Sequence, residues 1–364
     1  MKKFLTVLTL ILLLSVSCLL ITGCGEKKEE TYEIALVTDV GNIDDKSFNQ
    51  SAWEGVKAFA EENKISYNYY KPSEDSTAAR VETMKTAIET GAKVVVCPGY
   101  LFEDSVYEIQ DDYPEVQFLL LDGEPHDADY NYKTASNVHC ILYQEEQAGY
   151  FAGYAAVMDG YTKLGFLGGM DVPAVIRYGY GFVQGANDAA KKLGKEKDVS
   201  IKYWYSGSFA PTDEIKTKME SWYSDGTEVV FACGGGIYLS ATSAAEAANA
   251  KVIGVDKDQY FESETIITSA MKDLTTSVKL ALKDLYATDD DKWPEGLAGK
   301  TATLGAKDNC VGLPTAKTSW RLTKYTVAEY ETLFEAVKNG QVEIDNNSDK
   351  NVKPEVAITV DYQE

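Results

Sequence analysis

Short apolar runs recur along the chain and alternate with longer segments in which apolar residues fall at helical spacing. The run at residues 32–40 is apolar through its centre, and the segment at 47–63 that follows has apolar side chains every three or four positions. Short continuous apolar runs between such segments predict buried strands. We predict strands at residues 32–40, 65–71, 92–99, 116–123, 163–170, 199–207, 227–236 and 251–259.

Helical spacing follows nearly every one of these strands. Gly91 closes the segment at 76–91, as is typical of a helix C-terminus. The predicted helices cover residues 47–63, 76–91, 101–114, 145–160, 177–194, 212–226 and 238–250. Because strands that alternate with helices form parallel sheets covered on both faces, we predict an α/β protein.

The alternation fills two stretches of similar size, and no long linker separates them. A chain of this length also exceeds what one hydrophobic core usually supports, so two lobes joined by short crossings are expected. A helix at 275–287, a strand at 301–313 and a helix at 326–340 are expected to complete both lobes. We assign residues 32–142 plus about 265–310 to the N-terminal lobe, and residues 143–264 plus about 311–364 to the C-terminal lobe.

The first residues have the pattern of an export signal. Two lysines precede an apolar stretch at residues 4–20, and small residues then lead into Cys24. This arrangement predicts a bacterial lipoprotein signal peptide at residues 1–23, with Cys24 lipidated as the new N-terminus. The charged residues 24–31 would form a tether. A plain signal peptide or an anchor helix is the alternative.

Charge and composition narrow the class of partner. The 364-residue chain has 35 basic and 57 acidic residues, a net charge of −22, which disfavours nucleic acid as a partner of the folded body. Its histidines, His126 and His139, are isolated from each other, so we predict no metal site. A disulfide is left open for the widely spaced cysteines of the body, Cys97, Cys140, Cys233 and Cys310.

Ligands of open parallel sheets bind at the carboxyl ends of the strands, so the residues just after each predicted strand are candidates for a site. These positions hold carboxylates, aromatic rings and glycines, without a catalytic histidine, a serine elbow or an activated thiol. We therefore predict a binding protein and not an enzyme. No G-x-G-x-x-G or P-loop motif is present, and no cofactor is predicted. The glycines at 168–169 and 234–236 are also consistent with plain strand-to-helix turns.

Phe48 lies in the polar turn at 38–49, where an aromatic side chain neither satisfies nor bends the backbone. Either it folds into the core or a flat ligand stacks on it. Phe209 follows a strand of the other lobe, so closure of the lobes would clamp a heteroaromatic base between two rings. Ser47 is predicted to cap the next helix, and Asp45 to shape the turn or the start of that helix.

Polar groups near other strand ends suit the rest of a nucleoside. Asp122 is a candidate to accept a hydrogen bond from the base, and Asp256 to accept from paired ribose hydroxyls. Asn49 both donates and accepts, which suits a purine edge. Lys272 can donate to a sugar oxygen or to an acid. The alternatives are that Asp122 and Asp256 are helix N-caps and that Lys272 is a solvated charge.

Several segments together resemble the basic membrane protein family, which comprises lipoprotein substrate-binding proteins of ABC importers similar to the purine nucleoside receptor lipoproteins. The resemblance runs over nearly the whole mature chain and rests on ALVTDVGNIDDKSFNQSAWEG, LDG, AGYFAGYAA, LGFLGGMDVPAVIRYGYGFVQGA, GSFAPTD, VIGVDKDQ and ITSAMKD. It implies the type I periplasmic-binding-protein fold, an α/β architecture of two doubly wound parallel-sheet lobes joined by a three-crossing hinge.

The resemblance also implies a nucleoside held between Phe48 and Phe209. The polar ligand-binding residues of the family match Asp39, Asn49, Asp122, Asp256 and Lys272 of this chain. The family's GGTG turn departs here, because this chain reads Gly-Gly-Gly-Ile at residues 234–237. From that turn only a backbone donor at Gly235 is expected.

We therefore expect a lipid-anchored monomer on the extracytoplasmic face of a bacterial cell membrane. It would bind a nucleoside, with purines favoured, and deliver it to an ABC permease and ATPase complex. Another flat ligand such as riboflavin is an alternative, as is a sensor that reports occupancy to a signalling partner. An enzyme acting on nucleosides is disfavoured by the absence of a metal-binding aspartate cluster and of a phosphate loop.

Overall fold

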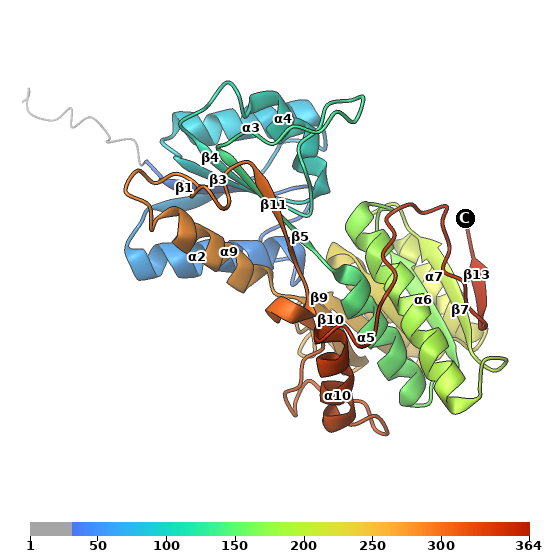
Figure 1. The fold of residues 1–364 in the computed structure, drawn as a ribbon. Helices are drawn as coiled ribbons and strands as arrows, with labels where there is room; N and C mark the ends of the chain where they lie inside the picture. The colour runs from blue at the N-terminus through green and yellow to red at the C-terminus, as the bar shows by residue number, and fades with distance from the viewer. Residues whose placement is uncertain (1–30) are drawn as a thin grey trace, which may run out of the picture. The chain divides into compact units, whose positions relative to one another are not determined.

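The structure is a computed structural model that describes residues 31–364. The predicted signal peptide, Cys24 and residues 25–30 of the predicted tether lie outside the described residues. One sheet of 6 strands and one of 7 strands form the body at Tyr32–Glu364 (Figure 1). Within residues 31–364, no helix combines the length and the apolar character that a membrane crossing requires.

The first sheet has the strand order β11-β5-β4-β3-β1-β2, and its strand pairs are parallel. Its strands are β1 (Ile34–Val37), β2 (Tyr67–Tyr70), β3 (Val94–Pro98), β4 (Gln117–Leu121), β5 (Val138–Tyr143) and β11 (Lys300–Leu304). Its helices lie on both faces (Figure 1): α2 (Phe48–Asn63) and α9 (Leu274–Leu285) on one, α3 (Thr77–Glu89) and α4 (Glu103–Ile109) on the other.

Alternate side chains of β1 enter two different cores, as the pleat of a strand requires. Leu36 is buried in the same cluster as Val56 of α2. Val37 is buried in the same cluster as Met84 of α3. Burial on both faces explains why this strand is apolar at consecutive positions rather than at every second one.

The second sheet has the order β12-β10-β9-β8-β6-β7-β13, and it is parallel except where β12 pairs with β10. Its strands are β6 (Lys163–Gly168), β7 (Ser200–Tyr205), β8 (Val229–Cys233), β9 (Lys251–Asp256), β10 (Ile266–Lys272), β12 (Val311–Gly312) and β13 (Thr359–Tyr362). The helices packed with it are α5 (Glu145–Met158), α6 (Pro173–Leu193), α7 (Asp213–Ser224), α8 (Tyr238–Ala248) and α10 (Val327–Lys338).

Helices α5 and α6 approach each other so closely that glycine is required at their contact. A Cβ atom on Gly149 of α5 would lie 2.0 Å from the carbonyl oxygen of Tyr178. A Cβ atom on Gly181 of α6 would lie 1.9 Å from the carbonyl oxygen of Glu146. Both distances are far below any real carbon–oxygen contact, so the small residues seen in the sequence of α5 serve backbone-to-backbone packing.

Both sheets contain the same doubly wound core. In the first sheet the order β2-β1-β3-β4-β5 follows the flavodoxin-like pattern 2-1-3-4-5, and β7-β6-β8-β9-β10 repeats it in the second. The chain order reverses between β1 and β3 and again between β6 and β8. Ligand sites of such sheets lie at these reversal points, beyond the carboxyl ends of the strands.

The chain passes between the two sheets at three places. It leaves β5 at Tyr143 and begins α5 at Glu145, leaves β10 at Lys272 and begins α9 at Leu274, and leaves β11 at Leu304 before β12 at Val311. Helix α9 packs on α2 of the first lobe, so the second passage is a true crossing. These crossings have the hinge layout that the family resemblance implied.

Three details differ from the sequence-based expectation. Strands β5 and β10 were not predicted, because His139 and the Thr268–Ser269 pair interrupt their apolar runs, and the short C-terminal strand β13 was not predicted either. The single strand expected at 301–313 is two strands in different sheets, separated by the turn at Ala306–Asp308. The boundary placed at about 265 is also wrong, because β10 belongs to the second sheet and the chain crosses only after Lys272.

Candidate functional site

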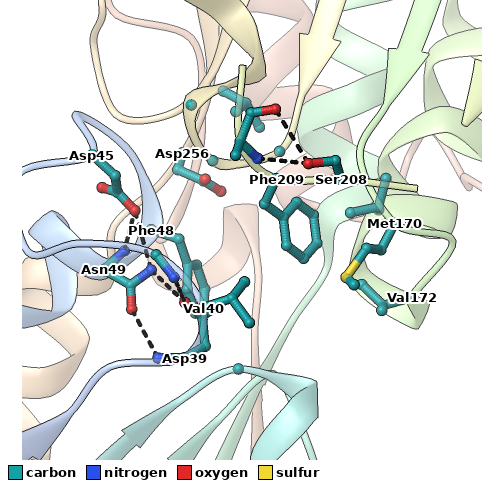
Figure 2. Close-up of a pocket in the computed structure, with 18 of the residues that line it drawn as sticks. Asp39, Val40, Asp45, Phe48, Asn49, Met170, Val172, Ser208, Phe209 and Asp256 are labelled. Carbon is teal, nitrogen blue, oxygen red and sulfur yellow. Dashed lines mark hydrogen bonds between the residues drawn. The ribbon is translucent and has the colours of Figure 1, made fainter. Parts of the chain in front are cut away.

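A cavity of about 600 Å³ lies beyond the carboxyl ends of the strands of both sheets (Figure 2). Its lining includes every ligand-binding residue predicted from the sequence: Asp39, Phe48, Asn49, Asp122, Phe209, Gly235, Asp256 and Lys272. This volume is in the usual range for a small-molecule site. The structure thus brings the predicted residues together, whereas their contacts with a ligand remain a prediction. The lipidation site, Cys24, is outside the described residues.

Asp45 organises the turn that carries Phe48. Its Oδ1 accepts hydrogen bonds from the backbone N–H of Ser47 at 2.8 Å and of Gln50 at 3.1 Å, and its Oδ2 accepts from that of Asn49 at 3.0 Å. Asp45 therefore satisfies the free N–H groups at the start of α2, as expected for a residue that shapes this helix start.

Ser47 occupies the N-cap position of α2, as predicted, but its side chain does not cap the helix. Its side chain makes no capping hydrogen bond, and its hydroxyl instead donates to Oδ2 of Asp256 at 2.5 Å. Since Asp45 already serves the helix start, the Ser47 hydroxyl is free to cross to the other lobe. This bond connects the turn before Phe48 with the predicted ribose-binding acid.

Asp39 and Asn49 form a second unit within the same turn. Oδ1 of Asp39 accepts from the Gly41 N–H at 2.7 Å and from Nδ2 of Asn49 at 2.8 Å. The same Nδ2 also donates to Oδ2 of Asp45 at 3.1 Å, so both amide hydrogens of Asn49 are held by carboxylates of its own turn. Burial raises the pKa of Asp39 to about 6, although these hydrogen bonds oppose the rise.

Phe48 and Phe209 project into the cavity from the two lobes, and the Asp256 carboxyl lies between them in the view of Figure 2. Each ring is partly buried against the core. Phe48 therefore combines the two alternatives considered for it, because part of its ring packs against the core and part lines the cavity. Phe209 needs glycine beneath it. A Cβ atom on Gly169 would lie 2.4 Å from Cδ1 of its ring, and one on Gly234 would lie 2.9 Å away. The glycine turns therefore seat this ring.

The remaining glycine candidate, Gly235, lies beside the backbone of Phe209. The Gly236 N–H donates to the Phe209 carbonyl oxygen at 2.8 Å, and a Cβ atom on Gly235 would lie 2.8 Å from the same oxygen. Gly235 also has a φ of 51°. The chain thus keeps a glycine here without the threonine that the family turn carries, and the backbone donor expected at Gly235 remains a prediction.

Lys272 is buried at the floor of the cavity among acids. Its Nζ donates to Oδ2 of Asp122 at 2.5 Å and to Oε1 of Glu145 at 3.1 Å. Nε of Arg177 donates to the other oxygen of Glu145 at 2.6 Å. Burial alone would lower the pKa of Lys272, but Asp122 and Glu145 outweigh it and hold that pKa above its ordinary value. The alternative that Lys272 is a solvated charge is wrong.

Asp122 and Asp256 lie at the carboxyl ends of two strands: Asp122 follows β4, and Asp256 is the last residue of β9. Both have left-handed backbone, with φ of 59° and 61°, and neither caps a helix within residues 31–364, so the N-cap alternative is wrong. Oδ1 of Asp122 is buried and has no hydrogen-bond partner among the described residues. Burial raises the pKa of Asp256 above its ordinary value. Asp122 therefore has an unused acceptor at the cavity, whereas the two oxygens of Asp256 accept from the Ser47 hydroxyl at 2.5 Å and the Tyr178 hydroxyl at 3.5 Å.

Sequence reasoning missed several residues of the site. Glu145 and Arg177 were placed in helices but were not recognised as buried charges, and Tyr178 was not singled out although its ring lines the cavity. A glutamate pair opening a helix of small apolar residues was the available signal for Glu145. For Arg177 and Tyr178 the sequence gives no such signal, because their burial depends on the glycine contact between α5 and α6.

The cysteines of the described body, whose pairing was left open, are free and buried: Cys97, Cys140, Cys233 and Cys310. Burial raises the pKa of Cys140 to about 12 and that of Cys310 to about 11. These thiols are therefore protonated near neutral pH, and of the four only Cys233 lines the cavity.

Known proteins resemble this chain over most of its length. The family described as ABC transporter substrate-binding protein PnrA-like matches residues 33–348. The chain is 29% identical over 299 residues to the ABC transporter nucleoside-binding protein BmpA of Lactococcus lactis. This alignment covers 76% of this chain and 80% of that protein. It is 30% identical over 310 residues to basic membrane protein A of Borreliella burgdorferi. That alignment covers 84% of this chain and 86% of the relative.

A solved solute-binding protein of an ABC transporter system from Aeropyrum pernix aligns with a TM-score of 0.73 at 22% identity, covering 88% of this chain and 95% of that one. This likeness, with the two sheet orders, confirms the type I periplasmic-binding-protein fold. The matched proteins are solute-binding proteins, which confirms the prediction of a binding protein rather than an enzyme. The chain belongs to the Bmp family of PnrA-like substrate-binding proteins of ABC transporters.

Proposed function

We propose that this extracytoplasmic substrate-binding protein takes up a purine nucleoside in the cavity between its lobes and delivers it to the permease of its ABC transporter. The observation that carries the proposal is the pair of aromatic rings, Phe48 and Phe209, that enter a cavity of about 600 Å³ from the two lobes. The Lactococcus lactis relative, named as nucleoside-binding, supports the same ligand class.

A base between the two rings would bury both of its faces. Stacking of a base on an aromatic side chain contributes about 1–3 kcal/mol and tolerates different bases, because every base has a π-face. Selection then depends on the polar groups at the edge of the base. Asp39 is the candidate for that edge, since its Oδ2 accepts no hydrogen bond within residues 31–364 and the residue lines the cavity.

The sugar would lie toward the acids at the cavity floor. Asp256 can accept from ribose hydroxyls, and Asp122 has a buried Oδ1 without a partner in the described chain. Lys272 has three N–H donors, of which Asp122 and Glu145 take two. A ligand without hydroxyls would leave these groups unpaired, which lowers its affinity.

Attachment to the membrane is the second part of the proposal. The sequence pattern before Cys24 supports a lipid on that cysteine, and the lipid would keep the protein close to its permease. Metabolic labelling with a radioactive fatty acid should mark the full chain and fail to mark Cys24→Ser.

The binding proposal is tested by calorimetric titration of the protein with inosine, guanosine, adenosine and riboflavin. We expect a purine nucleoside to bind most tightly, and Phe48→Ala or Phe209→Ala to weaken it by about 1–3 kcal/mol with little loss of stability. Phe261→Ala is the matched control, because this ring is 54% exposed and does not line the cavity. The proposal fails if no nucleoside binds more tightly than about 1 mM.

A further inference from the structure

The two oxygens of the Asp39 carboxyl have unequal surroundings. Oδ1 accepts two hydrogen bonds, from the Gly41 N–H at 2.7 Å and from Nδ2 of Asn49 at 2.8 Å. Oδ2 accepts none within residues 31–364. A Cβ atom on Gly99 would lie 3.5 Å from this Oδ2 and 3.6 Å from Cε1 of Phe48, so the free oxygen and the edge of the Phe48 ring border the same point beside Gly99.

This position is where the edge of a stacked base would come. Phe48, Asp39 and Gly99 all line the same cavity. A purine stacked on Phe48 could present to Oδ2 the edge that carries N1, which is an N–H donor in a 6-oxopurine and an unprotonated acceptor in other purines. Because Oδ1 already holds two donors, any proton on this carboxyl must be carried by Oδ2.

The charges around Asp39 leave both protonation states accessible. Asp45 on the same turn shares the Asn49 amide with it, while Arg80 of α3 lies near enough to oppose that negative charge. Arg80 is itself paired with Asp75 at 2.7 Å. On the far side of the cavity floor, Lys272 lies 4.8 Å from the centre of the Phe48 ring and is held by acids. With burial as the largest influence, the pKa of Asp39 is raised to about 6.

We propose that Asp39 selects the ligand edge by changing its protonation state: the charged Oδ2 accepts from the N1–H of a 6-oxopurine, and the protonated Oδ2 donates to an unprotonated N1. The inference rests on the proposed nucleoside function and specifies how that site distinguishes bases. No covalent step is involved. The proton is exchanged with solvent, released when a 6-oxopurine binds and taken up when a base with an N1 acceptor binds.

The two classes of base should therefore respond oppositely to pH. Apparent affinity falls with the fraction of protein in the competent state. Inosine, with its N1–H, should lose about tenfold in affinity for each pH unit below about 6, whereas purine riboside, with N1 as an acceptor and no 6-substituent, should gain as the pH falls toward 6. The ratio of the two affinities should change by up to about 100-fold between about pH 5 and pH 7.

The test is calorimetric titration of the full chain with inosine and with purine riboside across that range, repeated in buffers of different ionisation enthalpy. Proton release is expected with inosine and proton uptake with purine riboside. In Asp39→Asn the amide oxygen must take the place of Oδ1, so the NH₂ group becomes a fixed donor. This variant should favour purine riboside at every pH and lose the pH dependence of the ratio.

Two carboxamide variants serve as controls. Glu146→Gln removes a buried carboxyl outside the cavity and should keep the pH-dependent ratio. Asp122→Asn tests the rival source of that pH dependence, because burial raises the pKa of this cavity carboxyl to about 7. The inference is overturned if the ratio of the two affinities does not change with pH in the unmodified protein. It is also overturned if the pH dependence of that ratio persists in Asp39→Asn and is lost in Asp122→Asn. In both cases nucleoside binding itself still stands. Failure of both ligands to bind at any pH overturns the proposed function instead.

Discussion

Lys272 was predicted as a donor to a sugar or to an acid, and its surroundings also give it a role in the stability of the protein. It is 2% exposed and forms ion pairs with two buried carboxylates, Asp122 and Glu145. Its Nζ also lies 5.1 Å from the centre of the Tyr143 ring. Removing one partner of a buried ion pair leaves an uncompensated charge, which costs far more than loss of a surface pair.

Lys272→Met should therefore destabilise the protein by about 3–5 kcal/mol, because Asp122 would remain buried without its cation and Glu145 would keep only Arg177. Urea unfolding followed by circular dichroism measures this change. Adding Asp122→Asn to the variant should recover part of the loss, since one of the stranded charges is then removed. An unchanged unfolding midpoint, with only ligand affinity reduced, would mean that the role of Lys272 is confined to ligand binding.

Among the elements, helix α5 begins with two buried glutamates in different surroundings. Glu145 is neutralised by Arg177 and Lys272, and although burial works against it, its pKa lies below the ordinary value. Glu146 is 1% exposed, and its Oε2 has no partner among the described residues. Burial, with the neighbouring Glu145 charge, raises the pKa of Glu146 to about 7.

Because the folded-state pKa of Glu146 is raised from 4.5 to about 7, the neutral form is favoured in the folded protein and stability is lost as the pH rises through that interval. Glu146→Gln stays neutral. Its unfolding free energy should equal that of the unmodified protein at about pH 4 and exceed it by up to about 3 kcal/mol at about pH 8. Urea titrations at both pH values measure the difference, with the exposed Glu82→Gln as control. A difference independent of pH would contradict the prediction.

Helices and strands were predicted correctly where the apolar positions of a segment follow a single period. The helices and the fully apolar strands were placed within a few residues, because burial on both faces of each sheet leaves a continuous apolar run. Strand β10 was missed because Thr268 and Ser269 are buried in its centre, where their polarity imitates a loop. The segment at 301–313 was wrongly predicted as one strand, because its strand-like pattern continues across the passage from the first sheet to the second.

The residues that line the cavity were predicted by a different route. The topological rule for parallel sheets places strand ends at one edge, and the family segments supplied the particular residues there. What the sequence could not supply were contacts between distant segments. The Ser47 hydroxyl was assigned to a helix start because local capping is readable from sequence, whereas its bond to Asp256 joins residues 209 positions apart.

At the scale of the whole molecule, the lobes touch beside the crossings as well as through them. Nζ of Lys257 contacts both carboxylate oxygens of Glu54 at 2.6 Å. Nε2 of the buried Gln259 donates to the Lys46 carbonyl oxygen at 2.8 Å. With the Ser47–Asp256 bond, these contacts fix the turn that carries Phe48 to the second lobe. The two sides of the proposed clamp are thereby held in a defined relation.

Lys257→Glu should weaken this relation, because it places two carboxylates together where an ion pair was. The pair is only partly buried, with side chains 23% and 39% exposed, so a loss of about 0.5–1 kcal/mol in ligand affinity is expected. Small-angle X-ray scattering of the ligand-free protein should also give a larger radius of gyration. Combining Lys257→Glu with Glu54→Lys restores the pair and should reverse both effects. Equal affinity in all three proteins would show that the pair does not influence binding.

The glycine contact between α5 and α6 has a mechanical consequence. At these glycines the two helix backbones touch without intervening side chains, so we expect α5 and α6 to turn together. The first crossing enters α5 directly at Glu145, and α6 carries Ala174, Val175 and Tyr178 in the cavity wall. A change of backbone torsion at Gln144 should therefore move α5, α6 and this wall of the cavity together.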